Sequence, residues 1–443
     1  MRINNKIMTK ISDKSIIELI KREVKPALGC TEPIAVSLAV AIASEELEKL
    51  QLHVDRIDVE VSANILKNGM GVGVPGTGMV GLHIAAALGV TCGKSAYKLE
   101  VLREIDADSI TRAKKMLEDN TVNISLSDSE KRLFIKAICY SGLHKSEVTI
   151  EDNHDTVTKI IVDGKVLFEN FKIDNSDSNN VEDSSTSGAR YSLTIKRIWE
   201  FALSVNFSDI SFILESVTMN RALSKEGLEN RYGLKVGRTI RDNVHKNIFG
   251  DGLLTYSMAI TAAASDARMA GCTLPAMSNS GSGNQGITVT MPVIAAADKF
   301  GSTDEELARA LVLSHLVAIH IKHYLGRLSA LCGCVIASTG ASCGIVFLKK
   351  GNYDQITYAI KNMIGNITGM VCDGAKVGCA LKVASGVSSA VQSSILALDN
   401  ICISENDGII DKDIEKTIRN LGSIGSEGMR HTDTMILDIM VCK

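Results

Sequence analysis

Apolar residues recur at helical spacing over residues 11–24, where Ser12 is available as an N-cap. After a short break at a Lys-Pro-Ala-Leu-Gly run, Thr31 or Cys30 can cap a second helix, whose apolar body covers residues 34–47. Pro in the first turn of that helix fits its start, because its missing N–H is not needed there. The first fifty residues therefore predict two helices.

Strand-like alternation follows these helices, with turn-forming pairs such as Asp163-Gly164 between the runs. The expected strands cover residues 54–61, 122–126, 147–151 and 156–168. A glycine-dense loop over 69–81 leads into an apolar helix at 82–88. The loop does not end in Gly-Lys-Ser/Thr, so we interpret it as a tight packing turn and not as a nucleotide-binding P-loop. Residues 1–172 are predicted to form a mixed α/β domain.

A polar segment separates this region from the remainder of the chain. Residues 174–188 are nearly all Asn, Asp, Ser, Thr, Glu and Val, which bury too little apolar surface to offset ordering entropy. We predict a flexible linker over 173–190. Beyond it the period is helical, and Ala, Gly and Ser recur at three- and four-residue intervals. Residues 191–443 are predicted to form a compact all-α domain with small-residue helix packing, which makes the fold a two-domain α+β protein.

Net charge, cysteine number and the length of the apolar stretches limit the class of protein. The 48 basic and 51 acidic side chains give a net charge of −3, which disfavours nucleic acid and membrane surfaces as partners. The 11 cysteines are an odd number in a chain that shows no signal peptide at its start, so a disulfide scaffold is not indicated. The longest apolar stretches are shorter than the roughly 20 residues that span a bilayer. We expect a soluble cytoplasmic protein whose thiols stay reduced or bind a metal.

Cysteines are concentrated in one part of the second region. Cys332, Cys334, Cys343, Cys372 and Cys379 lie close together in the sequence, without the spacing or the histidines of a zinc finger. Soft thiolates without a zinc pattern favour an iron–sulfur cluster. The alternative is that these cysteines are small apolar residues of a helical core.

Cys30 is a second candidate for chemistry. It lies at a predicted helix N-terminus near Lys25, where free backbone N–H groups and a cation would lower the pKa of a thiol from about 8.5. A reactive thiolate is one interpretation. The other is an ordinary helix start that needs a small residue.

The loop over residues 278–286 offers short polar side chains and free N–H groups, which suit a small anion such as a carboxylate. Ser282 and Asn284 are our candidates for holding a substrate carboxylate. Arg430 joins them, because a guanidinium suits a carboxylate. A long polar turn is the alternative for the loop, and a solvated turn for Arg430.

His315, His320 and His323 fall on one predicted helix, and the last two share a face. Such residues could bind a metal or transfer protons. We favour their interpretation as ordinary core or surface histidines.

Four motifs carry a resemblance that covers nearly the whole chain. They are Leu-Gly-Cys-Thr-Glu-Pro at 28–33, the loop at 279–286, Leu-Ser-Ala-Leu-Cys-Gly-Cys at 328–334, and Val-Cys-Asp-Gly-Ala-Lys-Val-Gly-Cys at 371–379. With them the chain resembles the L-cysteine desulfidase family, which is related to the iron–sulfur L-serine dehydratase α chain. The resemblance implies that Cys332, Cys372 and Cys379 hold a [4Fe–4S] cluster and that Cys30 accepts a proton. Cys334 is an open alternative to Cys332.

The resemblance also implies a reaction. Three thiolates would leave one iron of the cluster without a protein ligand, free to act as a Lewis acid toward a small amino acid substrate. Cys30 would remove the α-proton, so that L-cysteine yields sulfide, ammonia and pyruvate. L-serine dehydration by the same groups is the first alternative, because the leaving group depends on contacts to one atom.

Two further alternatives belong to other classes. A lyase that uses pyridoxal phosphate would need Lys376 or Lys322 as a Schiff base, but no phosphate-binding cup is recognisable, so we expect no such cofactor. A non-catalytic iron–sulfur sensor or binding protein would need neither a base nor a substrate loop. Small-residue helical surfaces on a long chain are compatible with a homodimer.

Overall fold

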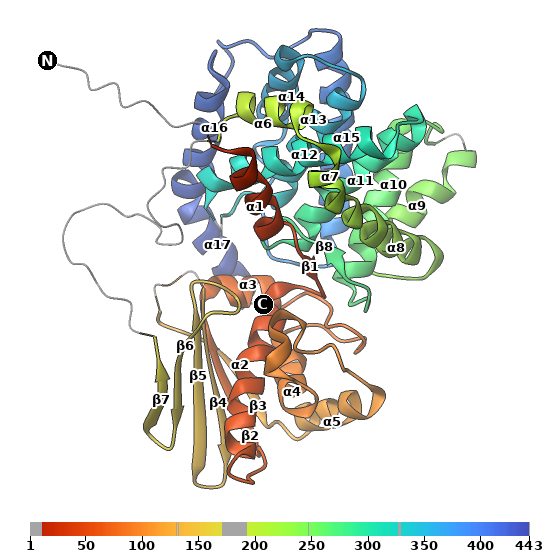
Figure 1. Cartoon of the computed structure of the whole chain (residues 1–443). Coiled ribbons are helices and arrows are strands. Elements are labelled where there is room, and N and C mark those ends of the chain that lie inside the picture. Colours follow the sequence, from red (N-terminus) through yellow and green to blue (C-terminus); the bar gives the residue numbers. More distant parts are fainter. Residues whose placement is uncertain are drawn as a thin grey trace, which may run out of the picture.

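The computed structural model describes residues 11–129, 131, 133–170, 193–246, 248–326 and 329–442. An α/β region lies at one end of the molecule and a larger helical region at the other (Figure 1). This arrangement confirms the predicted α+β fold with two parts. The linker predicted over 173–190 lies outside the described residues.

Six strands form the sheet of the α/β region in the order β3-β2-β4-β5-β6-β7. They are β2 (Arg56–Val61), β3 (Val122–Leu126), β4 (Phe134–Ser141), β5 (His144–Glu151), β6 (Val157–Val162) and β7 (Lys165–Glu169). β2 and β3 run parallel, and every other neighbouring pair is antiparallel. The run predicted at 156–168 divides at the Asp163-Gly164 turn into two strands. β4 was missing from the sequence prediction, because Ile138 is buried on the opposite face from Ile135 and Ala137 and weakens the alternation.

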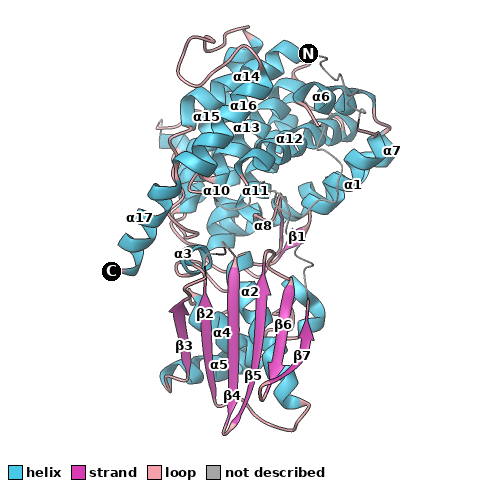
Figure 2. Ribbon diagram, turned by 90° about the vertical axis from the view of Figure 1, so that its left-hand side faces the viewer, coloured by secondary structure: helices cyan, strands magenta, loops and turns pink. Residues whose placement is uncertain are grey.

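Helices cover one face of this sheet (Figure 2). They are α2 (Thr31–Glu48), α4 (Leu82–Thr91) and α5 (Ala107–Glu118), with α3 (Ala63–Gly69) and the short 3-10 helix η1 (Ser95–Glu100) at the edges. The apolar residues of α2 and α4 and the inward residues of β2, β4 and β5 form one core. The sheet region therefore has a core of its own, as its mixed pattern predicted.

The second region is almost entirely helical, as predicted. Its helices are α1 (Asp13–Glu23), α6 (Ile195–Ser204), α7 (Phe207–Ile210), α8 (Glu215–Glu229), α9 (Val236–Asp242), α10 (Leu253–Met269), α11 (Gly283–Phe300), α12 (Asp304–Leu325), α13 (Gly333–Leu348), α14 (Tyr353–Ile367), α15 (Cys379–Leu398), α16 (Ile414–Ser423) and α17 (Arg430–Val441), with short turns η2 (Ser211–Leu214), η3 (Val244–Lys246) and η4 (Ile424–Gly428). Although α1 precedes the α/β region in sequence, its buried residues belong to the helical core.

α13 lies at the centre of this region, and all of its residues from 334 to 348 are buried. Small residues let its neighbours come close. A Cβ atom on Gly340 would lie 2.3 Å from the carbonyl oxygen of Ser314 on α12, and one on Gly344 would lie 2.6 Å from Val293 on α11. The predicted small-residue packing is therefore present.

The glycine-dense loop connects the two regions. Gly73 donates from its N–H to the carbonyl oxygen of Met269 (2.9 Å), and a Cβ atom on Gly73 would lie 2.4 Å from the carbonyl carbon of Ala270. Two very short strands, β1 (Pro26–Ala27) and β8 (Ala276–Met277), pair antiparallel nearby. The glycine-dense loop is therefore a packing turn, as the sequence suggested. The candidate site lies where this loop brings the α/β region and the helical region into contact.

One helix in the described part of the chain, α15, is long and apolar enough to cross a membrane. Of its most apolar window, 56% is buried inside the molecule. α15 packs against α10, α13 and α14, and such burial is also found in the core helices of soluble proteins.

Candidate active site between the two regions

Cys332 and Cys372 lie on neighbouring backbone segments, although forty residues separate them in sequence. Leu331 and Val371 form an antiparallel bridge. The N–H of Cys332 donates to the carbonyl oxygen of Met370 (3.0 Å), and the N–H of Cys372 donates to that of Ala330 (2.6 Å). This pairing holds the first cysteine at the N-cap of α13 and the second directly beside it.

Cys379, the first residue of α15, joins the same electrostatic neighbourhood. Burial and the neighbouring thiols of Cys372 and Cys379 together raise the pKa of Cys332 to about 12, against the lowering effects of the Cys334 backbone N–H and of Lys382. Burial likewise raises the pKa of Cys379, with Cys372 adding to the effect. Cys372 and Cys379 thus both lie close enough to Cys332 to act on its pKa, and Cys372 acts on Cys379, so the three predicted ligands are neighbours.

Cys334 has a different environment. Its Sγ lies 3.1 Å from the carbonyl oxygen of Lys382, and a Cβ atom on Gly386 would lie 2.4 Å from that sulfur. Burial raises the pKa of this thiol well above its usual value, and the thiols of Cys332 and Cys379, which lie nearby, add to the effect. The Cys334 side chain thus fills the contact between α13 and α15, which favours Cys332 over Cys334 as a ligand.

Two lysines flank the three thiols. Asp373 forms ion pairs with both Lys376 and Lys382, and Lys382 Nζ also donates to the carbonyl oxygen of Val371 (2.8 Å). Burial acts to raise the pKa of Asp373, but the hydrogen bonds from the two lysines outweigh it and bring the pKa to about 2. The loop between Cys372 and Cys379 is therefore held by ion pairs and places positive charge beside the thiols, where it can offset thiolate charge.

Cys30 lies at the N-cap of α2 and is 3% exposed. It packs with Val72 and Met269, and Cys379 contacts the same cluster. Burial raises the pKa of Cys30 to about 11; Arg268 lowers it, while Glu32 and Cys379 raise it. The expectation of a lowered thiol pKa is wrong here, because loss of hydration outweighs the cation, and that cation is Arg268 and not Lys25.

Arg268, at the end of α10, was not predicted. It is 5% exposed and lies within hydrogen-bonding reach of the Cys30 thiol. Its Nη2 donates to the carbonyl oxygen of Gly29 (2.8 Å), and its Nη1 donates to Oδ1 of Asn284 (3.3 Å). One sequence signal existed: Asp266 and Arg268 are the charged residues in an otherwise apolar and small-residue run over 258–272.

The polar loop lies on the other side of Arg268. Ser282 caps α11 by accepting from the N–H of Gln285 (3.3 Å), and Thr31 Oγ1 donates to the carbonyl oxygen of Gly281 (3.5 Å). Oε1 of Gln285 lies 3.3 Å from where a Cβ atom on Gly333 would be, directly after Cys332. Ser282 and Asn284 therefore lie between the Cys30 turn and the start of α13.

Arg430 is not part of this group. It is exposed at the start of α17, and among the described residues no contact links it to Ser282 or Asn284. Its helix is held to the α/β region by the ion pair between Asp433 and Lys67 on α3. The sequence placed Arg430 beside polar residues, but in the structure Arg430 does not contact Ser282 or Asn284.

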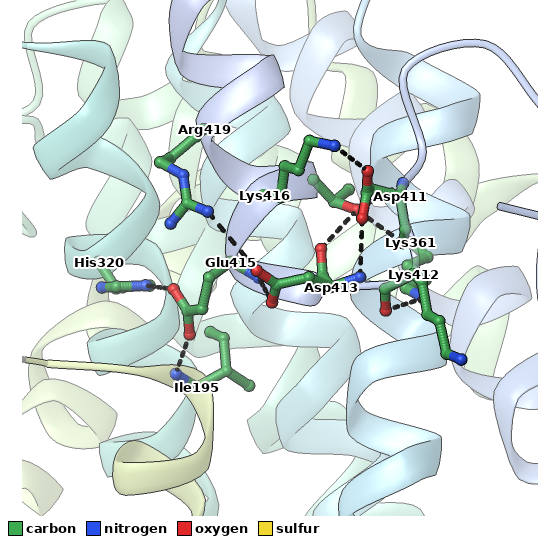
Figure 3. A network of polar contacts seen from close by, with 10 residues as sticks. Ile195, His320, Lys361, Asp411, Lys412, Asp413, Glu415, Lys416 and Arg419 are labelled. Carbon is green, nitrogen blue, oxygen red and sulfur yellow. Dashed lines mark hydrogen bonds and ion pairs between the residues drawn. The ribbon is translucent and has the colours of Figure 1, made fainter. Parts of the chain in front are cut away.

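The histidines have structural partners. His315 is fully buried, with Nδ1 3.0 Å from Nδ2 of Asn279 and Nε2 3.1 Å from Oγ1 of Thr290, and burial lowers its pKa to about 3. His320 Nε2 lies 2.7 Å from Glu415, which also accepts from the N–H of Ile195 (2.7 Å). Figure 3 shows this second network at the base of α16. Both arrangements fit the core interpretation and not a metal site.

No three His, Cys, Asp or Glu side chains in the described ranges are grouped closely enough to hold a single metal ion. One cavity of about 300 Å³ lies between α1 and the start of α8, and another of about 280 Å³ lies between α8 and the segment before β8; neither is lined by the cysteines. The candidate site is therefore a group of thiols in which Cys30 is buried and Cys332, Cys372 and Cys379 are partly exposed.

Comparison with known proteins identifies the family. Residues 96–438 match the sequence pattern of the serine dehydratase alpha chain family. The chain belongs to this family. It is 47% identical to a UPF0597 protein of Bacteroides thetaiotaomicron, over 98% of this chain and 99% of that relative. It is also 48% identical to a UPF0597 protein of Oleidesulfovibrio alaskensis (96% and 97% covered) and 46% identical to one of Shewanella halifaxensis (96% and 98% covered).

The match to the serine dehydratase alpha chain family covers most of the candidate site. The three clustered cysteines, Arg268 and the 279–286 loop all lie within 96–438, whereas Cys30 precedes that range. The UPF0597 relatives match over nearly the full length of the chain. The chain therefore combines the pattern of the serine dehydratase alpha chain family with an N-terminal segment that carries Cys30.

Proposed function

We propose that this member of the serine dehydratase alpha chain family is a [4Fe–4S]-dependent lyase that converts L-cysteine to pyruvate, sulfide and ammonia. The observation that carries the proposal is the meeting of Cys332, Cys372 and Cys379, with Cys30 packed against the third of them. We further propose that the enzyme works in the cytoplasm.

The donor set fits such a cluster. In a [4Fe–4S] cluster each iron takes its own thiolate, so the ligands surround an extended cube and need not converge on one ion. This requirement is compatible with three neighbouring thiols that form no single-ion site. The cations of Lys376 and Lys382 would offset thiolate charge. When bound, the cluster would supply a Lewis acid for the leaving group of the substrate.

The side chains of the chain itself would perform the remaining steps. Cys30, acting as the thiolate, takes the proton from Cα of the substrate onto Sγ, the Cα–Cβ double bond forms, and the Cβ–S bond breaks with its electron pair leaving on sulfur. The product, 2-aminoacrylate, tautomerises to an imine that water hydrolyses to pyruvate and ammonia. Ser282 and the loop around it orient the substrate. Burial of Cys30, which is 3% exposed, keeps bulk water away from its thiol.

L-serine is the second candidate substrate, and the family name favours it. The same removal of the α-proton would release water instead of sulfide. Anaerobically purified protein should be assayed for sulfide from L-cysteine and for pyruvate from L-serine. A higher kcat/KM for L-cysteine supports the proposal, and a higher value for L-serine assigns the alternative.

Cys30→Ser tests the base. We expect kcat to fall by roughly 10² or more, because a positioned base contributes about that factor. The matched control is Cys402→Ser, since Cys402 Sγ donates to the carbonyl oxygen of Ile403 and its charged neighbour is Lys361, not a residue of the candidate site. If Cys30→Ser retains full turnover, Cys30 is not the base. If wild-type protein turns over neither amino acid and neither changes its visible spectrum, the protein is a non-catalytic iron–sulfur protein.

A further inference from the structure

Arg268 is a buried cation whose contacts are all neutral. The side chain is 5% exposed, and its Nε–H has no hydrogen-bond partner. Its other N–H groups donate to the carbonyl oxygen of Gly29, to the amide oxygen of Asn284 and to the sulfur of Met269 (3.4 Å). None of the ion pairs within the described ranges includes Arg268. Burying a charge without a counter-ion is costly, so this environment suits an anionic ligand.

The nearest acidic residues are engaged elsewhere. Glu32, which neighbours Cys30, accepts a hydrogen bond from Thr31 Oγ1 (3.2 Å). Asp266, on the same helix as Arg268, accepts from the N–H of Gly237 (3.0 Å) at the start of α9. Among the described residues, no carboxylate therefore forms an ion pair with the guanidinium.

The position of Arg268 is suited to a substrate. On one side it contacts the Gly29-Cys30 turn, and on the other Asn284. The adjacent Met269 packs with Cys30 and Cys379. Gly283 makes room for the side chain, because a Cβ atom there would lie 2.2 Å from Nε. The guanidinium thus lies beside both the proposed base and one proposed cluster ligand.

We infer that Arg268 binds the α-carboxylate of the amino acid on which the enzyme acts. This role rests on the proposed function and takes the place that the sequence suggested for Arg430. A guanidinium binds a carboxylate through two parallel hydrogen bonds, and a lysine cannot reproduce that geometry. The unpartnered Nε–H is a donor available for one of them. With the carboxylate fixed here, Cα of the substrate lies next to Cys30.

Calorimetry can test this role without turnover. The probe is L-alanine, which carries the α-carboxylate but no leaving group, and its neutral counterpart is L-alaninamide. Full-length, anaerobically purified protein should bind L-alanine at least tenfold more tightly than the amide. Arg268→Gln should abolish that preference while leaving amide binding unchanged, and Arg268→Lys should retain part of it. A wild-type protein without the preference, or Arg268→Gln with the full preference, overturns the assignment.

A second variant protects the test against misfolding of Arg268→Gln. Asn284→Asp is nearly isosteric and places a carboxylate 3.3 Å from Nη1 of Arg268. The new carboxylate should form an ion pair with Arg268 and so weaken L-alanine binding at least tenfold. Asn406→Asp, in an exposed loop, is the matched control and should bind L-alanine like wild type. Equal binding by Asn284→Asp and Asn406→Asp contradicts the role of Arg268.

Steady-state kinetics separate this inference from the proposed function. If wild type turns over L-cysteine or L-serine, Arg268→Lys should raise KM at least tenfold with a smaller fall in kcat. An unchanged KM refutes the carboxylate role and leaves the lyase proposal intact. If wild type has no turnover but shows a carboxylate preference that depends on Arg268, the anion site stands and the lyase proposal fails.

Discussion

Arg268 Nη2 donates a hydrogen bond of 2.8 Å to the carbonyl oxygen of Gly29, the residue immediately before Cys30. This contact joins α10 of the helical region to the turn that precedes α2 of the α/β region. The position of Cys30 therefore depends on how the two regions pack, and so does its distance from Cys379. The predictions below test the thiol group and the contacts that hold the two regions together.

The cysteines should differ in their effect on iron content. Wild-type protein purified without oxygen should contain about four irons and four sulfides per chain. Cys332→Ser, Cys372→Ser and Cys379→Ser should each reduce iron to less than about one per chain, because each removes one of three ligands. Iron and acid-labile sulfide analysis measures this directly.

Cys334→Ser and Cys402→Ser are the controls for that series. Both should keep the wild-type iron content, because Cys334 fills a helix contact and Cys402 lies away from the three thiols. Loss of iron in Cys334→Ser but not in Cys332→Ser would move the ligand assignment to Cys334. Zinc in place of iron in the wild type would refute the cluster.

Gly73→Ala should destabilise the contact between the regions. An added Cβ atom would lie 2.4 Å from the carbonyl carbon of Ala270, and backbone cannot move aside as a flexible side chain can. We expect a loss of about 1–3 kcal/mol in the free energy of unfolding, as for other overpacked sites. Urea denaturation measures it, with Gly250→Ala as control, since nothing lies within 4 Å of a Cβ atom there. Equal stability of the two variants would show that the contact is loose.

Asp433→Asn should release α17 from the α/β region. Lys67 is 3% exposed and pairs with Asp433, so removing the carboxylate leaves a buried ammonium group without its partner. Because Asp433 itself is a quarter exposed, we expect a reduced penalty of about 1–3 kcal/mol, together with faster proteolysis within α17.

Two variants control the Asp433 experiment. Asp438→Asn alters an exposed aspartate on the same helix and should have no effect. The double variant Lys67→Met/Asp433→Asn removes both charges and should recover most of the lost stability. A double variant no more stable than Asp433→Asn alone would refute the ion pair as the cause.

Glu415→Gln should destabilise the protein in a pH-dependent way. Burial acts to raise the pKa of Glu415, but the hydrogen bond and charge of His320 and the Ile195 N–H hold it below its usual value. A carboxyl with a depressed folded pKa contributes stability above its unfolded pKa of about 4.3 and loses it as the pH falls through the folded pKa. We expect a loss of about 1–3 kcal/mol at pH 7, which shrinks below about pH 4.

Urea denaturation at pH 7, 5 and 3.5 follows this difference. Glu305→Gln, at an exposed ion pair with Arg309 on α12, is the control and should change stability by less than about 0.5 kcal/mol. A difference between Glu415→Gln and wild type that stays constant down to pH 3.5 would contradict the charge-based explanation.

Several features of the site were readable from local sequence. Cys30 was predicted at a helix N-terminus and Ser282 in a loop that opens a helix, and both lie at helix starts, because small or capping residues before apolar runs mark such positions. The environment of these side chains, and with it their pKa, could not be predicted from the sequence. The pKa of Cys30 is raised and not lowered, since desolvation depends on residues from three other segments that pack around it.

The sequence by itself determined the two-part α+β architecture, the small-residue packing of the helices and the chemical types available at the site. These properties follow from periodicity, propensity and composition, which act over a few neighbouring residues. Only the tertiary structure decided that Leu331 pairs with Val371, that Cys334 fills a helix contact, and that Arg268 and not Arg430 lies beside Cys30. Contacts between residues far apart in the chain arise when whole elements bury their apolar faces together, and no local pattern encodes that choice.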